Sequence, residues 1–230
     1  MKLKSLLGVL GGMGPEATVY FLEKLVDKTD ARTDQEHIPI VIFNNPRVPD
    51  RTLAYLGKGE SPLPALLYGI KKLEDSGADL IAIPCNSAHL WLTEMRKNTN
   101  AEILSMVDIA VKRIRAGYKI GIIGTTLTVL SKLYESPLRD KGVEVLLPKD
   151  QEKVMKQIRL IKAGNIEKAS LKLTKIANEL IERGATHILA GCTEVPLALK
   201  KDDLSVPIID PMEVTAEECI LRTGGRIRRE

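Results

Sequence analysis

The stretch "SGADLIAIPCNSA", residues 76–88, ends an apolar run on a proline and a cysteine and then turns polar. The stretch "RGATHILAGCTEV", residues 183–195, repeats that order, with a glycine, an apolar run, a cysteine and polar residues. Short apolar runs bounded by turn-forming residues are typical of buried β-strands. The sequence therefore predicts two strands that each carry a cysteine at the carboxyl end.

The similarity continues on both sides of these stretches. "LLGVLGG" at 6–12 resembles "KIGIIGTT" at 119–126, and "ILSMVD" at 103–108 resembles "VPIIDP" at 206–211. These pairs keep the same order along the chain, so the chain consists of two related halves. Related α/β halves usually pack about a pseudo-twofold axis and bind ligands between the carboxyl ends of their strands. That geometry would bring the two cysteines face to face.

Runs rich in Val, Ile and Leu alternate with longer amphipathic segments, which is the pattern of an α/β protein with parallel sheets. The predicted strands are 4–10, 38–44, 79–84, 101–106, 119–124, 143–147, 186–190 and 206–209. The clearest predicted helices are 62–76, 150–163 and 166–183, and the last two are each followed by a glycine. The prolines and asparagines of 44–52, "NNPRVPDRT", indicate a loop at a strand end, where function is often carried.

The composition narrows the class of protein. Of the 230 residues, 44% are hydrophobic, and no stretch has the roughly 18 to 20 consecutive apolar residues that a membrane span needs. We therefore expect no membrane association. The 34 basic and 30 acidic residues are mixed along the chain and only 3% of residues are aromatic, so nucleic acid is not an expected partner.

The amino-terminal residues and the cysteine count point to a cytoplasmic protein. The apolar run Leu6–Leu10 after two lysines is shorter than the roughly 7 to 15 residues of a secretory signal, and we interpret it as the first strand. Three cysteines without a C-x-x-C pair fit neither a disulfide framework nor a zinc site. A reducing compartment and no metal are expected.

The glycine turn "GMGPEA", residues 12–17, matches the G-x-G-x-x-G/A pattern of dinucleotide-binding proteins. Such proteins also need an acidic residue at the end of the second strand, and here that strand ends in Asn44 and Asn45. A nicotinamide cofactor is therefore not expected. The turn is either a packing turn or a cradle for an anion at a helix N-terminus.

The paired cysteines, Cys85 and Cys192, suggest proton transfer at a carbon atom. Each is followed by polar residues that could open a helix, and a helix N-terminus lowers the pKa of a thiol. One thiolate could remove a proton from a carbon acid while the other thiol delivers a proton to the opposite face. A redox role needs two sulfurs close enough to bond, which a substrate between them forbids. Donors for the substrate carboxylate would be backbone N–H groups with Asn86, Ser87, Thr125 and Thr193.

Other charged side chains are candidates for binding. Arg47 and Arg51 lie in the loop 44–52, and Lys162 lies at a predicted helix end; each is either a carboxylate ligand or a solvated charge. Glu194 is either an acid or base beside Cys192 or a capping carboxylate.

Two further residues are predicted to have structural roles. His89 could orient a group on its helix, but a structural histidine is favoured. Cys219 lacks the strand-end setting of the other two cysteines and is predicted to lie in the core.

Together, "GGMGPEAT", "NNPRVPDRT", "PCNSAH", "KAGN", "AGCTEVPL" and "IDPM" resemble the cofactor-independent aspartate/glutamate racemase family, specifically its aspartate racemase branch. The resemblance implies an α/β fold of two pseudo-symmetric Rossmann-like lobes with parallel sheets and the active site in the cleft between them. It implies a first lobe of 1–100 plus 207–230, which carries Cys85, and a second lobe of 101–206, which carries Cys192. It also implies a homodimer and racemisation of acidic amino acids by two thiols, without pyridoxal phosphate or another cofactor.

The resemblance also assigns roles to single residues. Cys85 and Cys192 match the two acid/base cysteines, and Arg51 and Lys162 match the cations that recognise the side-chain carboxylate. The residues that match positions around the α-carboxylate and amino group are Met13, Asn86, Ser87, Thr125 and Thr193. The glutamate racemase branch has an Asp-Ser-Gly first turn and a histidine where this chain has Glu194, which favours aspartate as the substrate.

Three positions depart from the family pattern. Ser87 replaces the usual threonine and keeps the hydroxyl, Leu127 replaces a small residue, and Arg47 replaces a neutral or acidic one. The last two leave glutamate or broad-specificity racemisation open, and hydantoin racemisation is a separate alternative within the same superfamily. A non-catalytic protein that binds an acidic metabolite through Arg51 and Lys162 is the alternative from another class.

Overall fold

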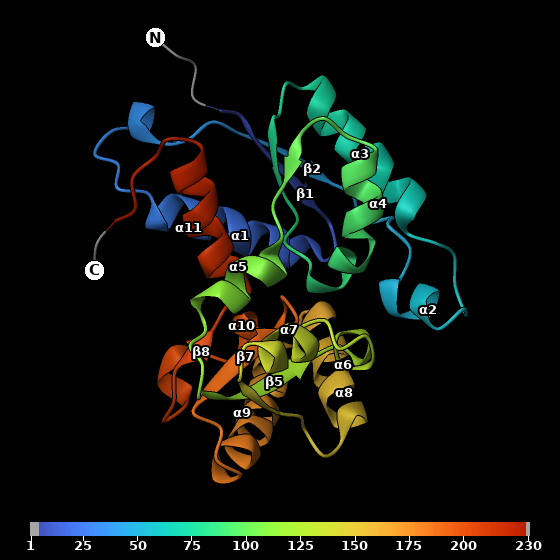
Figure 1. Ribbon diagram of the computed structural model, residues 1–230, viewed down its shortest axis with the longest axis vertical. Helices are drawn as coiled ribbons and strands as arrows, with labels where there is room; N and C mark the ends of the chain where they lie inside the picture. The colour runs from blue at the N-terminus through green and yellow to red at the C-terminus, as the bar shows by residue number, and fades with distance from the viewer. Residues whose placement is uncertain (1–4, 229–230) are drawn as a thin grey trace. The chain divides into compact units, whose positions relative to one another are not determined.

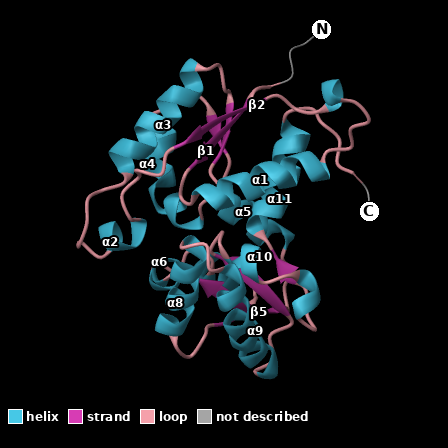
Figure 2. Ribbon diagram, turned by 180° about the vertical axis from the view of Figure 1, so that it is seen from behind, coloured by secondary structure: helices cyan, strands magenta, loops and turns pink. Residues whose placement is uncertain are grey.

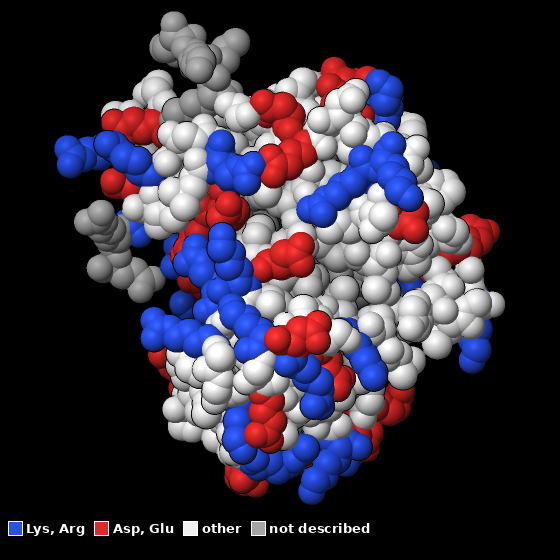
Figure 3. Space-filling view, viewed as in Figure 1, with Lys and Arg blue, Asp and Glu red and all other residues white. Residues whose placement is uncertain are grey.

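The computed structural model describes residues 5–228 and divides into two compact α/β units. The first unit joins the chain up to Met106 with the chain from Met212 onward, and the second spans Val107–Pro211. Among the residues that the structure describes, no helix has the length and apolar character that a membrane crossing needs. Basic and acidic side chains are interspersed on the face of the molecule that Figure 3 shows, as the nearly balanced composition predicts.

The first unit is built on a parallel sheet in the order β2-β1-β3-β4. Its strands are β1 (Leu7–Gly11), β2 (Ile40–Asn44), β3 (Leu80–Ala82) and β4 (Glu102–Ile103). Helices α1 (Pro15–Lys28) and α11 (Pro211–Arg222) lie on one side of the sheet and α3 (Leu63–Asp75) and α4 (Leu92–Lys97) on the other, as Figures 1 and 2 both show. The short helix α2 (Arg51–Tyr55) and the 3-10 turns Asp34–Glu36 and Asn86–Trp91 complete it.

The second unit repeats this plan with a parallel sheet in the order β6-β5-β7-β8. Its strands are β5 (Lys119–Gly124), β6 (Glu144–Leu146), β7 (His187–Gly191) and β8 (Ile208–Ile209). Its helices are α5 (Met106–Arg113), α6 (Thr126–Leu130), α7 (Glu135–Asp140), α8 (Gln151–Lys162), α9 (Ile166–Glu182) and α10 (Val195–Ala198), with a 3-10 turn at Lys201–Asp203. Both sheets have the same strand order, so the predicted α/β fold of two related halves is confirmed, as are the eight predicted strand positions. Lys4, where the first predicted strand begins, lies outside the described residues.

One glycine in each sheet sets the distance between the first strand and a covering helix. A Cβ at Gly8 of β1 would lie 3.3 Å from Leu73 Cβ of α3, and a Cβ at Gly121 of β5 would lie 3.1 Å from Leu180 Cβ of α9. Both separations are tighter than ordinary carbon contacts, so the missing side chain lets the helix pack directly on the strand. The matching glycines of the sequence repeat thus have the same packing role in both units.

The limits of the units differ from the predicted lobes by a few residues at each crossing. Strand β4 pairs with β3, with Ile81 opposite Ile103, so residues predicted to begin the second lobe complete the first sheet. Strand β8 pairs with β7, with Leu189 opposite Ile209, so the last strand remains in the second sheet and does not return to the first lobe. Pairing between strands sets these limits, and the apolar pattern of a single strand does not reveal its partner.

The last helix does return to the first unit. Lys28 of α1 forms an ion pair with Glu213 of α11, with 2.6 Å between Nζ and Oε1. Beside it, Thr29 and Ile227 form an antiparallel bridge. The first unit is therefore assembled from both ends of the chain.

The strand order places a ligand-binding position in each sheet. In a 2-1-3-4 order the chain direction across the sheet reverses between the first and third strands, and ligands of open α/β sheets bind at the carboxyl ends of those two strands. In the first unit the loops after β1 and β3 carry Met13 and Cys85. In the second, the loops after β5 and β7 carry Thr125 and Cys192.

Candidate active site

Cys85 lies at the carboxyl end of β3 and begins the 3-10 turn Asn86–Trp91. The residue is 4% exposed and belongs to an apolar cluster that includes Met13, Val48 and Ala88. Its N–H donates to the carbonyl of Ile83 at 2.7 Å, which holds the tight turn after the strand. The first cysteine therefore lies at the predicted strand end, and the polar residues after it open a 3-10 turn that leads into α4.

His89 fixes the backbone of Cys85. Its Nδ1 lies 2.9 Å from the carbonyl oxygen of Cys85, and its Nε2 accepts a hydrogen bond from the N–H of Met106 at 3.0 Å. Because Met106 N–H is a donor, Nε2 must carry the lone pair, and Nδ1–H then donates to Cys85. The ring is buried, so its role is structural, as the sequence favoured.

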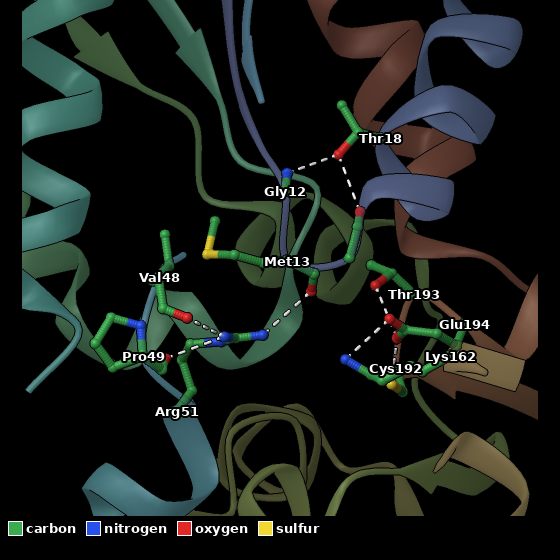
Figure 4. Close-up of polar contacts among 11 residues, drawn as sticks. Gly12, Met13, Thr18, Val48, Pro49, Arg51, Lys162, Cys192, Thr193 and Glu194 are labelled. Atoms are coloured by element: carbon green, nitrogen blue, oxygen red, sulfur yellow. Dashed lines mark hydrogen bonds and ion pairs between the residues drawn. The ribbon is translucent and has the colours of Figure 1, made fainter. Parts of the chain in front are cut away.

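Arg51 is held against the backbone of two loops, as Figure 4 shows. Its Nη1 donates to the carbonyls of Val48 at 3.2 Å and Pro49 at 3.0 Å, and its Nη2 donates to the carbonyl of Met13 at 3.4 Å. Arg51 Nε is buried and donates to no acceptor within residues 5–228. The guanidinium is thus fixed in place with one N–H group unused, which is a suitable arrangement for an anion.

The other candidates in the first unit divide into buried and exposed residues. Met13, Asn86 and Ser87 are buried, at 3%, 2% and 8% exposure. Arg47 is exposed, and its backbone N–H donates to Asn45 Oδ1 at 3.1 Å. The structure therefore separates the two arginines of the loop, with Arg51 turned inward and Arg47 at the surface.

The glycine turn after β1 is closely packed. Gly12 has a φ of 96°, and a Cβ there would lie 2.3 Å from the backbone of Asn45, so only glycine fits. Its N–H donates to Thr18 Oγ1 at 2.9 Å, and Thr18 Oγ1 donates to the carbonyl of Gly14 at 3.0 Å (Figure 4). These contacts explain the glycines of the turn by packing, without a nucleotide.

Cys192 directly follows β7 and lies in a polar cluster at the end of the strand (Figure 4). Its Sγ donates to Glu194 Oε2 at 2.9 Å, and Thr193 Oγ1 donates to the same oxygen at 3.2 Å. Lys162, the last residue of α8, lies with Nζ 3.1 Å from Glu194 Oε1. The side chain of Glu194 is 4% exposed and that of Lys162 is 41% exposed, so a buried carboxylate joins the thiol to a cation at the surface.

The expected effect of a helix N-terminus on this thiol is not found. Burial raises the pKa of Cys192 well above its ordinary value, and the neighbouring Glu194 carboxylate raises the pKa further while Lys162 lowers it. The following helix α10 has only four residues, and its first turn begins after Glu194. Glu194 makes no side-chain capping bond to α10, so the capping interpretation is wrong and the interpretation as a partner of Cys192 is supported by the contacts.

Thr125 lies at the end of β5 and caps helix α6. Its Oγ1 accepts from Thr128 N–H at 3.1 Å and lies 3.0 Å from Thr128 Oγ1, which in turn donates to the carbonyl of Gly191 at 2.9 Å. Gly191 is the residue before Cys192, so Thr128 supports the backbone of the thiol loop. Sequence reasoning missed Thr128, because its bond to the carbonyl of Gly191 joins residues 63 positions apart and no local pattern indicates it.

The remaining chemistry-bearing residues lie in the interior. Cys219 of α11 is fully buried, as predicted, and burial raises its pKa strongly with a further contribution from Glu218. Leu127 of α6 is also fully buried. Within the described part of the chain, no group of three or more His, Cys, Asp and Glu side chains is placed to hold a metal ion.

Comparison with known proteins gives consistent relatives. The chain is 34% identical to the Picrophilus torridus aspartate racemase, whose solved structure superposes with a TM-score of 0.90 over 97% of this chain and 96% of that one. It is 30% identical over 224 residues to the broad specificity amino-acid racemase RacX of Bacillus subtilis strain 168, covering 94% of this chain and 96% of RacX. It is 27% identical over 150 residues to the glutamate racemase of Persephonella marina, covering 61% of this chain and 56% of that enzyme.

The names of these relatives indicate three different substrate ranges. The similarity therefore identifies the class of enzyme but not its substrate. The model of the Asp/Glu/Hydantoin racemase family matches residues 10–219, a span that includes both strand-end cysteines, Arg51, Lys162 and Glu194. The chain therefore belongs to the Asp/Glu/hydantoin racemase family and is an amino-acid racemase.

Proposed function

We propose that this enzyme racemises an acidic amino acid, with aspartate favoured, by a two-thiol, two-base 1,1-proton transfer without pyridoxal phosphate or another cofactor. The observation that carries the proposal is the presence of one cysteine after the third strand of each of two sheets with the same strand order. Each is the place where an open α/β sheet presents functional groups to a ligand.

The proposed reaction moves one proton in and one proton out at the α-carbon. The thiolate of one cysteine removes the α-proton, so a C–H bond breaks and an S–H bond forms while the electron pair passes into the α-carboxylate. The thiol of the other cysteine then gives its proton to the opposite face of the carbon, so an S–H bond breaks and a C–H bond forms. The product is the other enantiomer, and the two cysteines have exchanged protonation states.

Donors that hold the α-carboxylate lower the cost of the charge that develops there. The proposed donors are Asn86 and Ser87 beside Cys85, and Thr125 and Thr193 in the second unit, all of them buried. Met13 would border the same region, because the turn that it occupies follows β1 and its carbonyl accepts from Arg51.

Preference for an acidic side chain is proposed to come from Arg51 and Lys162. Arg51 presents a fixed guanidinium with an unused Nε–H, and Lys162 presents a partly exposed ammonium. Two cations held at separate points would select a second carboxylate over a neutral side chain. Broad specificity is the second candidate, and it is favoured by the 30% identity to RacX.

The test incubates the purified protein with L-aspartate in D₂O without pyridoxal phosphate. Formation of D-aspartate that carries deuterium at the α-carbon is expected, with asparagine and neutral amino acids turned over at least about tenfold less efficiently, since each charge-assisted contact to a carboxylate contributes about 1.5–3 kcal/mol. Glutamate should be turned over more slowly than aspartate. If neither D-aspartate nor α-deuterium appears and the other amino acids are also inert, the proposal fails. Equal rates across the panel would favour broad specificity instead.

We further propose that the enzyme works as a homodimer in the cytoplasm, on the strength of the family resemblance. Analytical ultracentrifugation of the purified chain gives its mass in solution, and a species of one chain mass at all concentrations would contradict the dimer. Fractionation of cells that express a tagged chain tests the location.

A further inference from the structure

The two candidate catalytic thiols differ in what lies beside them. Cys192 Sγ donates to a carboxylate oxygen of Glu194 at 2.9 Å. Over residues 5–228, by contrast, no hydrogen bond of Cys85 Sγ is observed, although each cysteine belongs to an apolar cluster of its own unit. One thiol therefore has an internal proton acceptor within hydrogen-bonding distance and the other does not.

Burial of the Glu194 carboxylate costs free energy, and the contacts of the carboxylate have to offset that cost. A carboxylate with only 4% of its side chain exposed is unfavourable unless it is paired and hydrogen-bonded. Its contacts are a thiol, a hydroxyl and an ammonium, from Cys192, Thr193 and Lys162. It caps no helix, so these three contacts are the role that the structure gives it.

We propose that Glu194 and Cys192 share a single proton, so that Glu194 holds Cys192 as a thiol in the ligand-free enzyme and receives that proton when Cys192 has to act as a base. The base role rests on the proposed function. In the transfer the S–H bond of Cys192 breaks and an O–H bond of Glu194 forms, and the reverse step restores the thiol. Glu194 acts through Cys192 and is a positioning residue.

In the ligand-free enzyme, sharing one proton avoids the most costly state of this buried pair. The forms thiol with carboxylate and thiolate with carboxylic acid both carry one negative charge, whereas thiolate beside carboxylate would place two anions together in a buried site. The ammonium of Lys162, 3.1 Å from the far oxygen of Glu194, stabilises the single charge and makes removal of a proton from the pair easier. Lys162 thus sets how readily the pair ionises.

An asymmetry between the two half-reactions follows. In the resting enzyme Cys192 is the proton donor, so Cys85 must be the first base, and the free enzyme is prepared for the enantiomer whose α-proton faces Cys85. The two enantiomers have equal free energy, so kcat/KM must be the same in both directions. The asymmetry therefore has to be measured as a difference in ionisation between the two thiols, because the two values of kcat/KM cannot show it.

The test follows alkylation of each cysteine by iodoacetamide as a function of pH, using mass spectrometry of the separate cysteine peptides. Glu194→Gln removes the anion that raises the pKa of Cys192, so the midpoint of Cys192 alkylation should move to lower pH. Lys162→Met removes the cation that lowers this pKa, so the midpoint should move to higher pH. When the midpoint moves by about one pH unit, the alkylation rate measured below it changes about tenfold.

Three controls show whether the effect is local. The Cys85 midpoint in the same samples should stay unchanged in both variants. Glu135→Gln and Lys153→Met alter residues of the second unit that pair with Arg139 and Asp150, and both should leave Cys192 unchanged. Comparing midpoints and not absolute rates separates ionisation from access to a buried thiol.

The proposal is overturned if Glu194→Gln leaves the Cys192 midpoint in place, if it moves both cysteines together, or if both charge variants shift Cys192 in the same direction. Alkylation requires no turnover, so this result stands even if the racemase assay fails. Where turnover is found, Glu194→Gln should lower kcat with little change in KM and shift the pH profile, because the change lies at the proton donor and not at a substrate contact.

Discussion

In the first unit the cysteine at the end of the third strand is fixed through its backbone, and in the second it is fixed through its side chain. The ring of His89 holds the carbonyl of Cys85, while the thiol itself lies in an apolar cluster. The thiol of Cys192 is bonded to Glu194, and its backbone is supported through Gly191 by Thr128. The two sheets nevertheless have the same strand order.

The comparison separates what the duplicated scaffold supplies from what individual residues supply. Strand order and the matching glycines Gly8 and Gly121 put a cysteine at the same point of each sheet. The ionisation of that cysteine then depends on its immediate neighbours, because burial and a nearby carboxylate act over a few ångströms. Equal positions therefore do not imply equal chemistry.

The largest effect is expected from removal of either strand-end thiol. Cys85→Ser and Cys192→Ser should each lower the racemisation rate by about 10²–10⁴-fold, which is the usual contribution of a positioned acid or base. Cys219→Ala should retain a rate near that of the unaltered enzyme, because Cys219 is fully buried in α11. Polarimetry or chiral chromatography gives the rates; similar losses in all three variants would mean that the cysteines are structural.

The two cations provide the next contrast. Arg51→Met and Lys162→Met should each lower kcat/KM for aspartate by about 10- to 100-fold, since a hydrogen bond to a charged group contributes about 1.5–3 kcal/mol. Both variants should also lower the free energy of unfolding, because Arg51 holds three carbonyls and Lys162 is the cation paired with the buried carboxylate of Glu194. Steady-state kinetics and urea unfolding measure both, with exposed Arg47→Met as the control. A loss for neutral amino acids as large as that for aspartate would contradict recognition of a side-chain carboxylate.

A smaller effect is expected where Cys85 is held by its backbone. His89→Phe keeps a ring but leaves Cys85 C=O and Met106 N–H without this partner, which should cost about 1–3 kcal/mol of unfolding free energy. His187→Phe is the matched change in the second unit, because His187 stacks on Tyr118 with centroids 4.1 Å apart and a phenyl ring can keep that contact. It should stay within about 0.5 kcal/mol in denaturant titrations. Equal losses would remove the distinction between the two histidines.

The smallest effect concerns alkaline stability. The raised thiol pKa values of Cys192 and Cys219 mean that the unfolded chain releases protons before the folded chain does, so stability falls as pH rises above the ordinary thiol pKa of about 8.5. Below that pH neither thiol makes the free energy of unfolding depend on pH. Cys219→Ala should flatten the decline by at most about 1.4 kcal/mol per pH unit. Urea titrations between neutral and alkaline pH test this, and parallel curves for the two proteins would contradict it.

Much of the fold could be predicted because its signals are local. Apolar runs and glycine turns locate all eight strands, and the repeat reveals the two related halves. The residues at which the units begin and end were harder to predict from the sequence, because the placement of β4 and β8 depends on which strand each one pairs with. A two-residue strand carries too little pattern to identify that partner.

In the candidate site, too, the features set by local sequence could be predicted and those set by contacts between distant segments could not. The strand-end positions of Cys85 and Cys192 follow from the chain segment around each of them. The contact of Glu194 with Lys162 does not, because it requires the end of α8 to lie beside the end of β7. Burial and the Glu194 carboxylate raise the pKa of Cys192 although Lys162 lowers it, so a helix-terminus argument drawn from the neighbouring residues predicted the wrong direction.

The way the chain crosses between the units has a consequence for its synthesis. The second unit is one continuous segment, whereas the first waits for α11, which supplies the Glu213 partner of Lys28, and for Ile227, which bridges to Thr29. On a ribosome that adds about 5–20 residues per second, the second unit can emerge and fold before the first has its last helix. The Cys192 pair would then be assembled while the sheet that carries Cys85 still lacks one of its covering helices.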